Sequence, residues 1–266
     1  MSGFAMSDRS SPPAATADPV VRDADGSRAL DFDNGTVQSR MLADDPSRLV
    51  LEYTRLMMGF LLLHPAPSRL AMIGLGGGSL AKYCREHLPD ADFTAIEISP
   101  AVIALREQFA VPPDGPRFRI LCEDGAAFAR RDAAPLDVLL VDGFDRGGQP
   151  ASLCSAAFYD ACRDRLGAGG VLVVNLHSDE PDCPACVERI GQTFDGRIVA
   201  VRADHSENIV VFAGAEAPFP PPFETILARL RSLELTHPVE LGVAARKILE
   251  YRAPQPARGR RRRRER

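Results

Sequence analysis

The sequence lacks the features that would place the protein in a membrane or in an oxidising compartment. Its longest apolar run, LMMGFLLL at 56–63, is far shorter than the roughly 18 residues that a membrane-spanning helix needs. Six cysteines scattered over 266 residues do not predict a disulfide framework. Residues 1–26 contain neither the basic region nor the apolar core of a secretory signal. We therefore expect a cytoplasmic protein without a membrane anchor.

Composition is that of a globular protein, but the charge is unevenly distributed. Apolar residues make up 45% and charged residues 26% of the chain, whose formal charge is −4. Residues 258–266, RGRRRRRER, carry seven Arg and one Glu, so the rest of the chain holds a net charge of about −10. Such a basic block is typical of a solvated arm, although it could contact nucleic acid or an acidic membrane. The acidic body favours a cationic substrate.

The chain divides by pattern into four segments. Residues 1–27 are rich in Ser, Pro, Ala and Asp and are expected to be disordered. Residues 28–63 are predicted to form a β-hairpin around DNG and a helix over 47–63. A Rossmann-like nucleoside-binding domain is expected over 64–252, followed by the disordered Arg-rich tail at 253–266.

The 64–252 segment alternates strands with helices. This alternation predicts an α/β fold with a mostly parallel, doubly wound sheet, and the last two strands are expected to form an antiparallel hairpin at its edge. The predicted strands are 69–75, 92–98, 117–122, 136–142, 170–176, 197–203 and 207–213. The predicted helices are 79–88, 100–109, 124–131, 151–165, 183–194, 222–232 and 238–250.

Three successive strand ends carry residues suited to a nucleoside. The first strand leads into GLGGGS, whose Gly74, Gly76, Gly77 and Gly78 would let the backbone turn and approach a ligand. Glu97 ends the next strand about twenty residues later, the spacing of a carboxylate that binds a ribose, although it could instead cap the following helix.

The third strand ends in EDG, where Asp124 and Gly125 could lie beside an adenine ring. Asp124 is also suited to cap the next helix, and the two roles can coexist. Together the three strand ends predict an adenosine-binding cleft at the carboxyl edge of the sheet.

The fourth strand ends in DGFD, which supplies two carboxylates. Asp142 follows an apolar run directly, and Asp145 lies three residues later on a Gly-rich loop. At the mouth of a nucleoside cleft such a pair can bind an ammonium group and remove its proton. The alternative is that Asp142 caps a turn and Asp145 is simply solvated.

In this order and spacing the motifs resemble those of the spermidine synthase (polyamine aminopropyltransferase) family. The resemblance spans about residues 28–215 and is carried by LDFDNGTVQ, the Tyr53 helix, HPAPSR, GLGGGS, EIS, EDG and DGFD. It implies a Rossmann-like fold of the kind found in S-adenosylmethionine-dependent methyltransferases, preceded by a small β-hairpin. The resemblance further implies a homodimer acting on a small-molecule amine.

The resemblance also implies roles for individual residues. Decarboxylated S-adenosylmethionine would be the co-substrate, with Glu97 on its ribose and Asp124 on its adenine. Asp142 would accept the amine's proton and Asp145 would anchor the amine. Gln38 and Tyr53 would line the amine tunnel, and no metal would be required.

Two positions depart from the family pattern. Gly77 stands where the family has an Asp that contacts the aminopropyl amine, and Arg55 stands where it has a Glu. Both changes leave open an S-adenosylmethionine-dependent methyltransferase, or a non-catalytic relative that keeps the nucleoside pocket.

Other candidates are weaker when judged from sequence. CPAC opens a predicted helix at Cys183, where a redox pair is one interpretation and structural cysteines are the favoured one. Asn175 and His177 end the fifth strand and are expected at the cleft rim, where His177 could carry a proton. Asn208 is expected to shape the turn of the edge hairpin.

Overall fold

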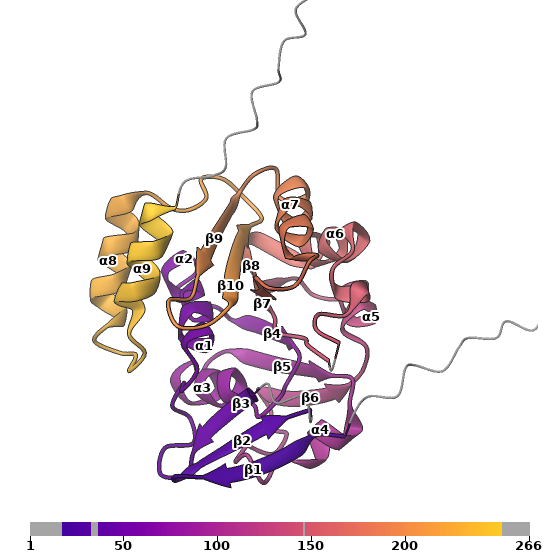
Figure 1. The fold of residues 1–266 in the computed structure, drawn as a ribbon. Coiled ribbons are helices and arrows are strands. Elements are labelled where there is room, and N and C mark those ends of the chain that lie inside the picture. The colour runs from indigo at the N-terminus through magenta and orange to yellow at the C-terminus, as the bar shows by residue number, and fades with distance from the viewer. Residues whose placement is uncertain (1–17, 33–36, 146, 252–266) are drawn as a thin grey trace, which may run out of the picture.

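The computed structural model describes residues 18–32, 37–145 and 147–251, which form two sheets and their helices (Figure 1). A three-stranded sheet comes first in the chain and lies against the lower end of the larger domain in the view of Figure 1. A seven-stranded sheet forms the body. Within the described ranges no helix has the length and apolar character needed to cross a bilayer.

The small sheet contains the predicted hairpin and one strand that was not predicted. β2 (Ser27–Asp31) pairs antiparallel with β3 (Val37–Leu42), and the DNG tip lies outside the described residues. β1 (Val20–Ala24) pairs antiparallel with β2, so the expectation of disorder up to residue 27 is wrong for this stretch. Residues 1–17 lie outside the described part, as do 252–266, which include the predicted tail.

The large sheet confirms the doubly wound prediction. Its strands are β4 (Arg69–Ile73), β5 (Asp92–Glu97), β6 (Phe118–Cys122), β7 (Leu136–Val141), β8 (Leu166–His177), β9 (Ile198–Arg202) and β10 (Asn208–Gly214). They lie in the order β6-β5-β4-β7-β8-β10-β9. The strands β6, β5, β4, β7 and β8 pair in parallel. β10 runs antiparallel to both β8 and β9, which gives the expected edge hairpin.

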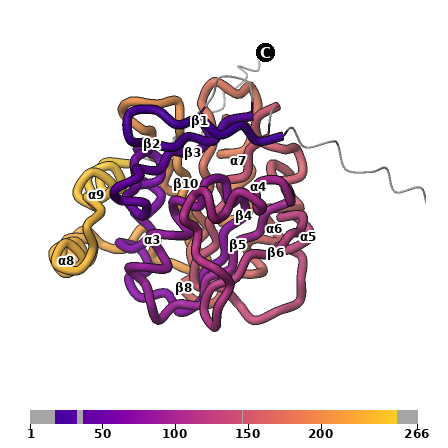
Figure 2. Tube along the Cα trace, turned by 90° about the horizontal axis from the view of Figure 1, so that it is seen from below, coloured from indigo at the N-terminus to yellow at the C-terminus, as the bar shows by residue number. Residues whose placement is uncertain are grey.

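Helices cover both faces of this sheet because its strands are apolar on both sides. They are α1 (Glu52–Met57), α2 (Phe60–Leu63), α3 (Ser79–His87), α4 (Pro100–Ala104), α5 (Gly125–Ala129), η1 (Ala151–Leu153), α6 (Ala156–Asp164), α7 (Cys183–Thr193), α8 (Phe223–Leu233) and α9 (Leu241–Glu250). Successive residues of β7 point to opposite faces: Leu140 belongs to the buried cluster that includes residues of α1, α2, α3, α8 and α9, whereas Leu139 belongs to the cluster that includes residues of α5, α6 and α7. Figure 2 shows α8 and α9 outside one flank of the molecule.

The single helix predicted over 47–63 is two short helices. The break falls at Gly59, whose N–H donates to the Leu56 carbonyl at 2.8 Å. A Cβ on Gly59 would lie 3.0 Å from Ala244 and 3.1 Å from Phe212, so the glycine permits close packing of α9 and β10. The periodicity of the apolar residues does not report this packing, because Phe212 and Ala244 lie far along the chain from Gly59.

Candidate active site

A cavity of about 820 Å³ opens at the carboxyl ends of the parallel strands. It lies over the neighbouring strands β4 and β7, where the strand order reverses. From β4 the chain continues outward to β5 and β6, and from β7 it continues to β8 on the other side. In open α/β sheets this crevice is the usual ligand site. The small sheet supplies one wall through Gln38 and Ser39, and α1 supplies Tyr53. The cleft predicted from the strand ends is therefore present.

Glu97 lies at the end of β5 as predicted, and its buried carboxylate lines the cavity. One carboxylate oxygen accepts a hydrogen bond from the Leu75 N–H at 2.9 Å, and the other accepts from the Ser99 N–H at 2.8 Å. These two bonds hold Glu97 in one orientation and tie it to the glycine loop. Each oxygen keeps a lone pair with which it can accept a further hydrogen bond, as from a ribose hydroxyl.

Asp124 caps the next helix as expected and lies in the cavity wall, where the predicted adenine contact would be made. It is the N-cap of α5, accepting a hydrogen bond from the Ala127 N–H at 2.8 Å, and it also lines the cavity together with Gly125.

The four glycines after β4 divide into two pairs. Gly74 and Gly76 line the cavity, whereas Gly77 and Gly78 are absent from its wall within the described chain. A Cβ on Gly77 would lie 2.6 Å from the Ser39 hydroxyl and 2.8 Å from Phe109, so this glycine packs the loop against its surroundings. The prediction that all four glycines contact a ligand is therefore not supported for Gly77 and Gly78, which shape the loop from behind.

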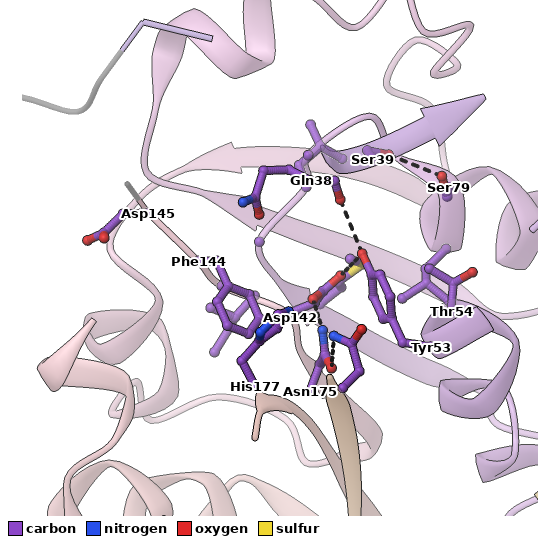
Figure 3. Close-up of a pocket in the computed structure, with 18 of the residues that line it drawn as sticks. Gln38, Ser39, Tyr53, Thr54, Ser79, Asp142, Phe144, Asp145, Asn175 and His177 are labelled. Atoms are coloured by element: carbon purple, nitrogen blue, oxygen red, sulfur yellow. Dashed lines mark hydrogen bonds between the residues drawn. The ribbon is translucent and has the colours of Figure 1, made fainter. Parts of the chain in front are cut away.

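Asp142 lies at the centre of the cavity's polar network (Figure 3). Its carboxylate accepts a hydrogen bond from Tyr53 Oη at 3.2 Å and another from Asn175 Nδ2 at 2.9 Å. Asn208 Nδ2 in turn donates to Asn175 Oδ1 at 3.0 Å. Asn208 is thus part of this network, and it also holds the hairpin turn as expected, since its Oδ1 accepts from Ser206 Oγ at 2.7 Å and its carbonyl accepts from the Ala203 N–H at 2.9 Å.

The position of Asp142 depends on Gly74. The Asp142 N–H donates to the Ile73 carbonyl at 2.8 Å, which brings the end of β7 against the glycine loop. A Cβ on Gly74 would lie 2.2 Å from the Asp142 carbonyl oxygen, and Gly74 has a positive φ of 92°. Only glycine meets both demands.

The environment of Asp142 suits a proton acceptor. Burial raises the pKa of this carboxyl, and the opposing influences are the hydrogen bonds from Asn175 and Tyr53 and the charge of His177. Burial and the nearby Asp142 carboxylate raise the pKa of Tyr53 well above its usual value, so its hydroxyl stays protonated and donates. A base is most effective when its pKa is close to the working pH, and burial moves Asp142 in that direction.

The remaining predicted residues lie around this network. The Gln38 carbonyl accepts a hydrogen bond from Tyr53 Oη at 3.3 Å, and its side chain reaches the cavity. His177 lines the cavity, with its ring 5.9 Å from that of Phe144 and its Nδ1 2.8 Å from Asp179. Asp145 lies apart from Asp142, exposed at the rim, where its carboxylate accepts from the Gly147 N–H at 2.7 Å (Figure 3).

Arg55 also reaches the cavity wall, but its guanidinium is largely engaged elsewhere. Its Nη1 donates to the carbonyls of Leu49 at 2.9 Å and Val50 at 2.6 Å. Arg55 therefore secures the segment before α1. As for metals, the described residues contain no group of three or more His, Cys, Asp or Glu that could hold an ion.

Comparison with known proteins agrees with this geometry. Residues 51–184 match the model of the spermine/spermidine synthase domain. The chain is 37% identical over 233 residues to a polyamine aminopropyltransferase of Chromobacterium violaceum, covering 86% of this chain and 89% of that protein.

Two solved structures share the fold. A probable spermidine synthase from Corynebacterium glutamicum superposes with a TM-score of 0.66 at 22% identity, covering 92% of this chain and 97% of that one. Human methyltransferase-like protein 13, solved in complex with SAH, superposes with a TM-score of 0.61 at 19% identity, covering 79% of this chain and 97% of that one. The chain therefore belongs to the spermine/spermidine synthase family, a family of aminopropyltransferases, and has the Rossmann-like fold found in methyltransferases.

Proposed function

We propose that the protein transfers an aminopropyl group from decarboxylated S-adenosylmethionine to an amine of a small polyamine, with Asp142 as the base. The observation that carries this assignment is the half-buried Asp142 carboxylate, oriented by Tyr53 and Asn175 at the centre of the cavity. Family membership supports the reaction class.

The nucleoside half of the donor would occupy the side of the cavity bounded by Glu97 and Asp124. Glu97 is fixed by two backbone N–H groups and would accept hydrogen bonds from the ribose hydroxyls. Asp124 and Gly125 would lie along the adenine. The cavity volume of about 820 Å³ is within the range of sites that enclose ligands of drug-like size.

The acceptor amine would attack the aminopropyl carbon next to the sulfonium. An alkyl ammonium with a pKa near 10.4 has no free lone pair at neutral pH, so it must first lose a proton. Asp142 would take that proton, the new C–N bond would form, and the C–S bond would break with its electron pair passing to sulfur. Methylthioadenosine then leaves, and alignment of the two reactants is the protein's main contribution to the rate.

The rest of the acceptor would extend toward the rim. Gln38 and Tyr53 line this part of the cavity, and the exposed Asp145 carboxylate could pair with a second ammonium group. Glu52, another carboxylate of the cavity wall, has both oxygens engaged, by the N–H groups of Asp204 at 2.7 Å and His205 at 2.8 Å, whereas within the described residues one oxygen of Asp145 accepts a hydrogen bond, from the Gly147 N–H. This engagement favours Asp145 over Glu52 as the distal anchor.

One observation keeps a methyltransferase as the second candidate. Gly77 provides no carboxylate to pair with the donor's amine, and Ser39 and Phe109 fill the space that a side chain there would need. Without a negative charge at this point, the carboxylate of intact S-adenosylmethionine would meet less repulsion. The same adenosyl sulfonium would then supply a methyl group.

The proposed setting is a reducing cytoplasm, and the proposed assembly is a homodimer. The six cysteines are scattered along the chain and do not have the spacing of a disulfide framework, which supports the first proposal. Sedimentation velocity of the full chain would give the assembly state directly, and a monomer at all concentrations would contradict a dimer.

The proposal is tested by titrating both donors into the protein by calorimetry. Tighter binding of decarboxylated S-adenosylmethionine supports aminopropyl transfer, whereas a strong preference for the intact nucleoside supports the methyltransferase. The Asp142→Asn variant identifies a third possibility, a non-catalytic binding protein. Such a protein would bind the donor equally well as wild type and as Asp142→Asn, and neither would show turnover.

A further inference from the structure

A chain of side-chain hydrogen bonds leads from Asp142 to the turn between β9 and β10. Asn175 Nδ2 donates to Asp142 Oδ1 at 2.9 Å, and Asn208 Nδ2 donates to Asn175 Oδ1 at 3.0 Å. Ser206 Oγ donates to Asn208 Oδ1 at 2.7 Å. The two asparagines are only 1% and 5% exposed. We call these four residues the amide chain; Figure 3 shows its inner end, where Asn175 meets Asp142.

The charge of Asp142 fixes the direction of every bond in the amide chain. An ionised carboxylate can only accept, so Asn175 must turn its Nδ2 toward it. The Asn175 oxygen then faces Asn208, which must also present its Nδ2. The Asn208 oxygen faces Ser206, whose hydroxyl therefore donates. All donors point toward Asp142, and each amide has a single orientation in which both of its ends are satisfied.

The sheet holds the two asparagines next to each other. β8 and β10 pair antiparallel with Asn208 opposite His177 and Val210 opposite Asn175. Asn175 and Asn208 are therefore diagonal neighbours on one face of the sheet, close enough for their side chains to meet. Since β10 lies between β8 and β9 in the sheet, the contact rests on a rigid part of the fold.

Asn208 decides which end of the Asn175 amide faces Asp142. If the Asn175 amide turned by half a rotation, its oxygen would face the carboxylate, and a hydrogen bond would be replaced by repulsion between two acceptors. The Asn208 Nδ2 group prevents this, because it binds the Asn175 oxygen on the far side. A buried amide oxygen that loses its donor is costly, so the held orientation is strongly favoured.

We propose that Asn208 is a positioning residue for Asp142, which acts through Asn175 to hold the carboxylate in its ionised, proton-accepting form. Its effect on the ionisation of Asp142 does not depend on which reaction the cavity performs. Its effect on the rate rests on the proposed aminopropyl transfer.

The other groups around Asp142 are consistent with this role. Burial raises the pKa of Asp142, and the hydrogen bond from Asn175 is the largest of the influences that lower it, ahead of Tyr53 on α1 and His177 on β8. The glycine loop after β4 carries no titratable side chain, and Gln38 from β3 is neutral. Weakening the Asn175 bond should therefore raise the pKa of Asp142, while Tyr53 and His177 stay in place.

The first test is the pH dependence of kcat/KM in Asn208→Leu, which removes the donor at similar volume. Loss of one hydrogen bond changes an equilibrium by about two- to tenfold, so the acid limb should move up by about 0.3 to 1 pH unit. The plateau kcat should fall by about two- to tenfold, with donor affinity unchanged. An acid limb that stays in place overturns the proposal.

Thr193→Val is the matched control. It removes a buried side-chain hydrogen bond of similar length, from Thr193 Oγ1 to Asp160 at 2.9 Å, and both residues lie outside the cavity wall among the described residues. It should lower stability without moving the acid limb. An equal shift of the limb in Thr193→Val and Asn208→Leu would show that loss of stability alone causes it, and would overturn the proposal.

A double-variant cycle tests whether Asn208 acts through Asn175. Asn175→Leu should move the acid limb in the same direction as Asn208→Leu, and by at least as much. Adding Asn208→Leu to Asn175→Leu should then produce no further shift, because the connection to Asp142 is already broken. Shifts that add in the double variant overturn the proposed route.

A second measurement needs no turnover and uses the wild-type protein. In ¹H–¹⁵N spectra, the side-chain amide signals of Asn175 and Asn208 should both shift with pH at the same midpoint, that of Asp142. These shifts should vanish in Asp142→Asn. If the Asn208 signal is independent of pH in the wild type, the proposal is overturned even if the leucine variants fail to fold. If both signals titrate but no aminopropyl product forms, the proposed function fails while the positioning role stands.

Discussion

Replacing Asp142 with Asn removes the proposed base while keeping its shape. In the wild type the carboxylate accepts from Asn175 at 2.9 Å and from Tyr53 Oη at 3.2 Å. In the variant the amide oxygen can still accept from Asn175, and the amide nitrogen can donate to Tyr53 Oη, so both hydrogen bonds can be replaced. The variant also loses a half-buried negative charge. We therefore expect the free energy of unfolding to change by no more than about 1 kcal/mol.

The rate, in contrast, should fall steeply. Losing a general base typically costs about 10²- to 10⁴-fold. An amine with a pKa near 10.4 is neutral in only about one molecule per thousand at pH 7.4. Without a base, the Asp142→Asn variant can use only this neutral fraction of the amine. The deficit should then shrink by about tenfold for each pH unit between 8 and 10, as free amine accumulates.

The assay is the initial rate of methylthioadenosine release with decarboxylated S-adenosylmethionine and a diamine, measured across pH. Asp137→Asn is the matched control, because Asp137 lies on the same strand and accepts the N–H groups of Ser68 and Arg69, away from the cavity. A rate deficit of less than tenfold at pH 7.4 would refute the role of Asp142, as would a deficit that does not vary with pH.

Three further predictions follow from individual contacts. His177→Gln removes a positive charge that lowers the pKa of Asp142, so the acid limb of the kcat/KM profile should move to higher pH while the plateau is unchanged; an unmoved limb would contradict this. Glu97→Gln should weaken donor binding by about 10- to 100-fold in calorimetry, and an unaltered Kd would remove Glu97 from the ribose site. Gly77→Ala should cost about 1–3 kcal/mol in thermal unfolding, since its Cβ would lie 2.6 Å from the Ser39 hydroxyl, and a Ser39→Gly exchange should recover part of it; equal stability of Gly77→Ala and wild type would argue against close packing there.

The parts of the site that could be predicted from sequence are those that follow strands. Glu97, Asp124 and Asp142 each come at or just after the end of a parallel strand, and parallel strands place these ends at one edge of a sheet. Alternating strands and helices likewise predicted the sheet, because βαβ units pair their strands in parallel. Local sequence was sufficient for both.

The parts that escaped prediction depend on contacts between distant segments. Asn208 joins the Asp142 network only because β10 inserts beside β8, which places it opposite His177 in the sheet. Gly77 lies behind the loop because Ser39 from the small sheet packs on it.

The central claim is that this cavity joins an aminopropyl group to an amine. Mass spectrometry of a diamine incubated with the protein and decarboxylated S-adenosylmethionine measures this most directly. The account predicts an acceptor heavier by one aminopropyl unit, formed with the wild type and lost with Asp142→Asn at neutral pH. Product formation that is unaffected by Asp142→Asn would contradict the account, as would an acceptor that gains only a methyl group when intact S-adenosylmethionine is supplied and nothing when the decarboxylated donor is supplied.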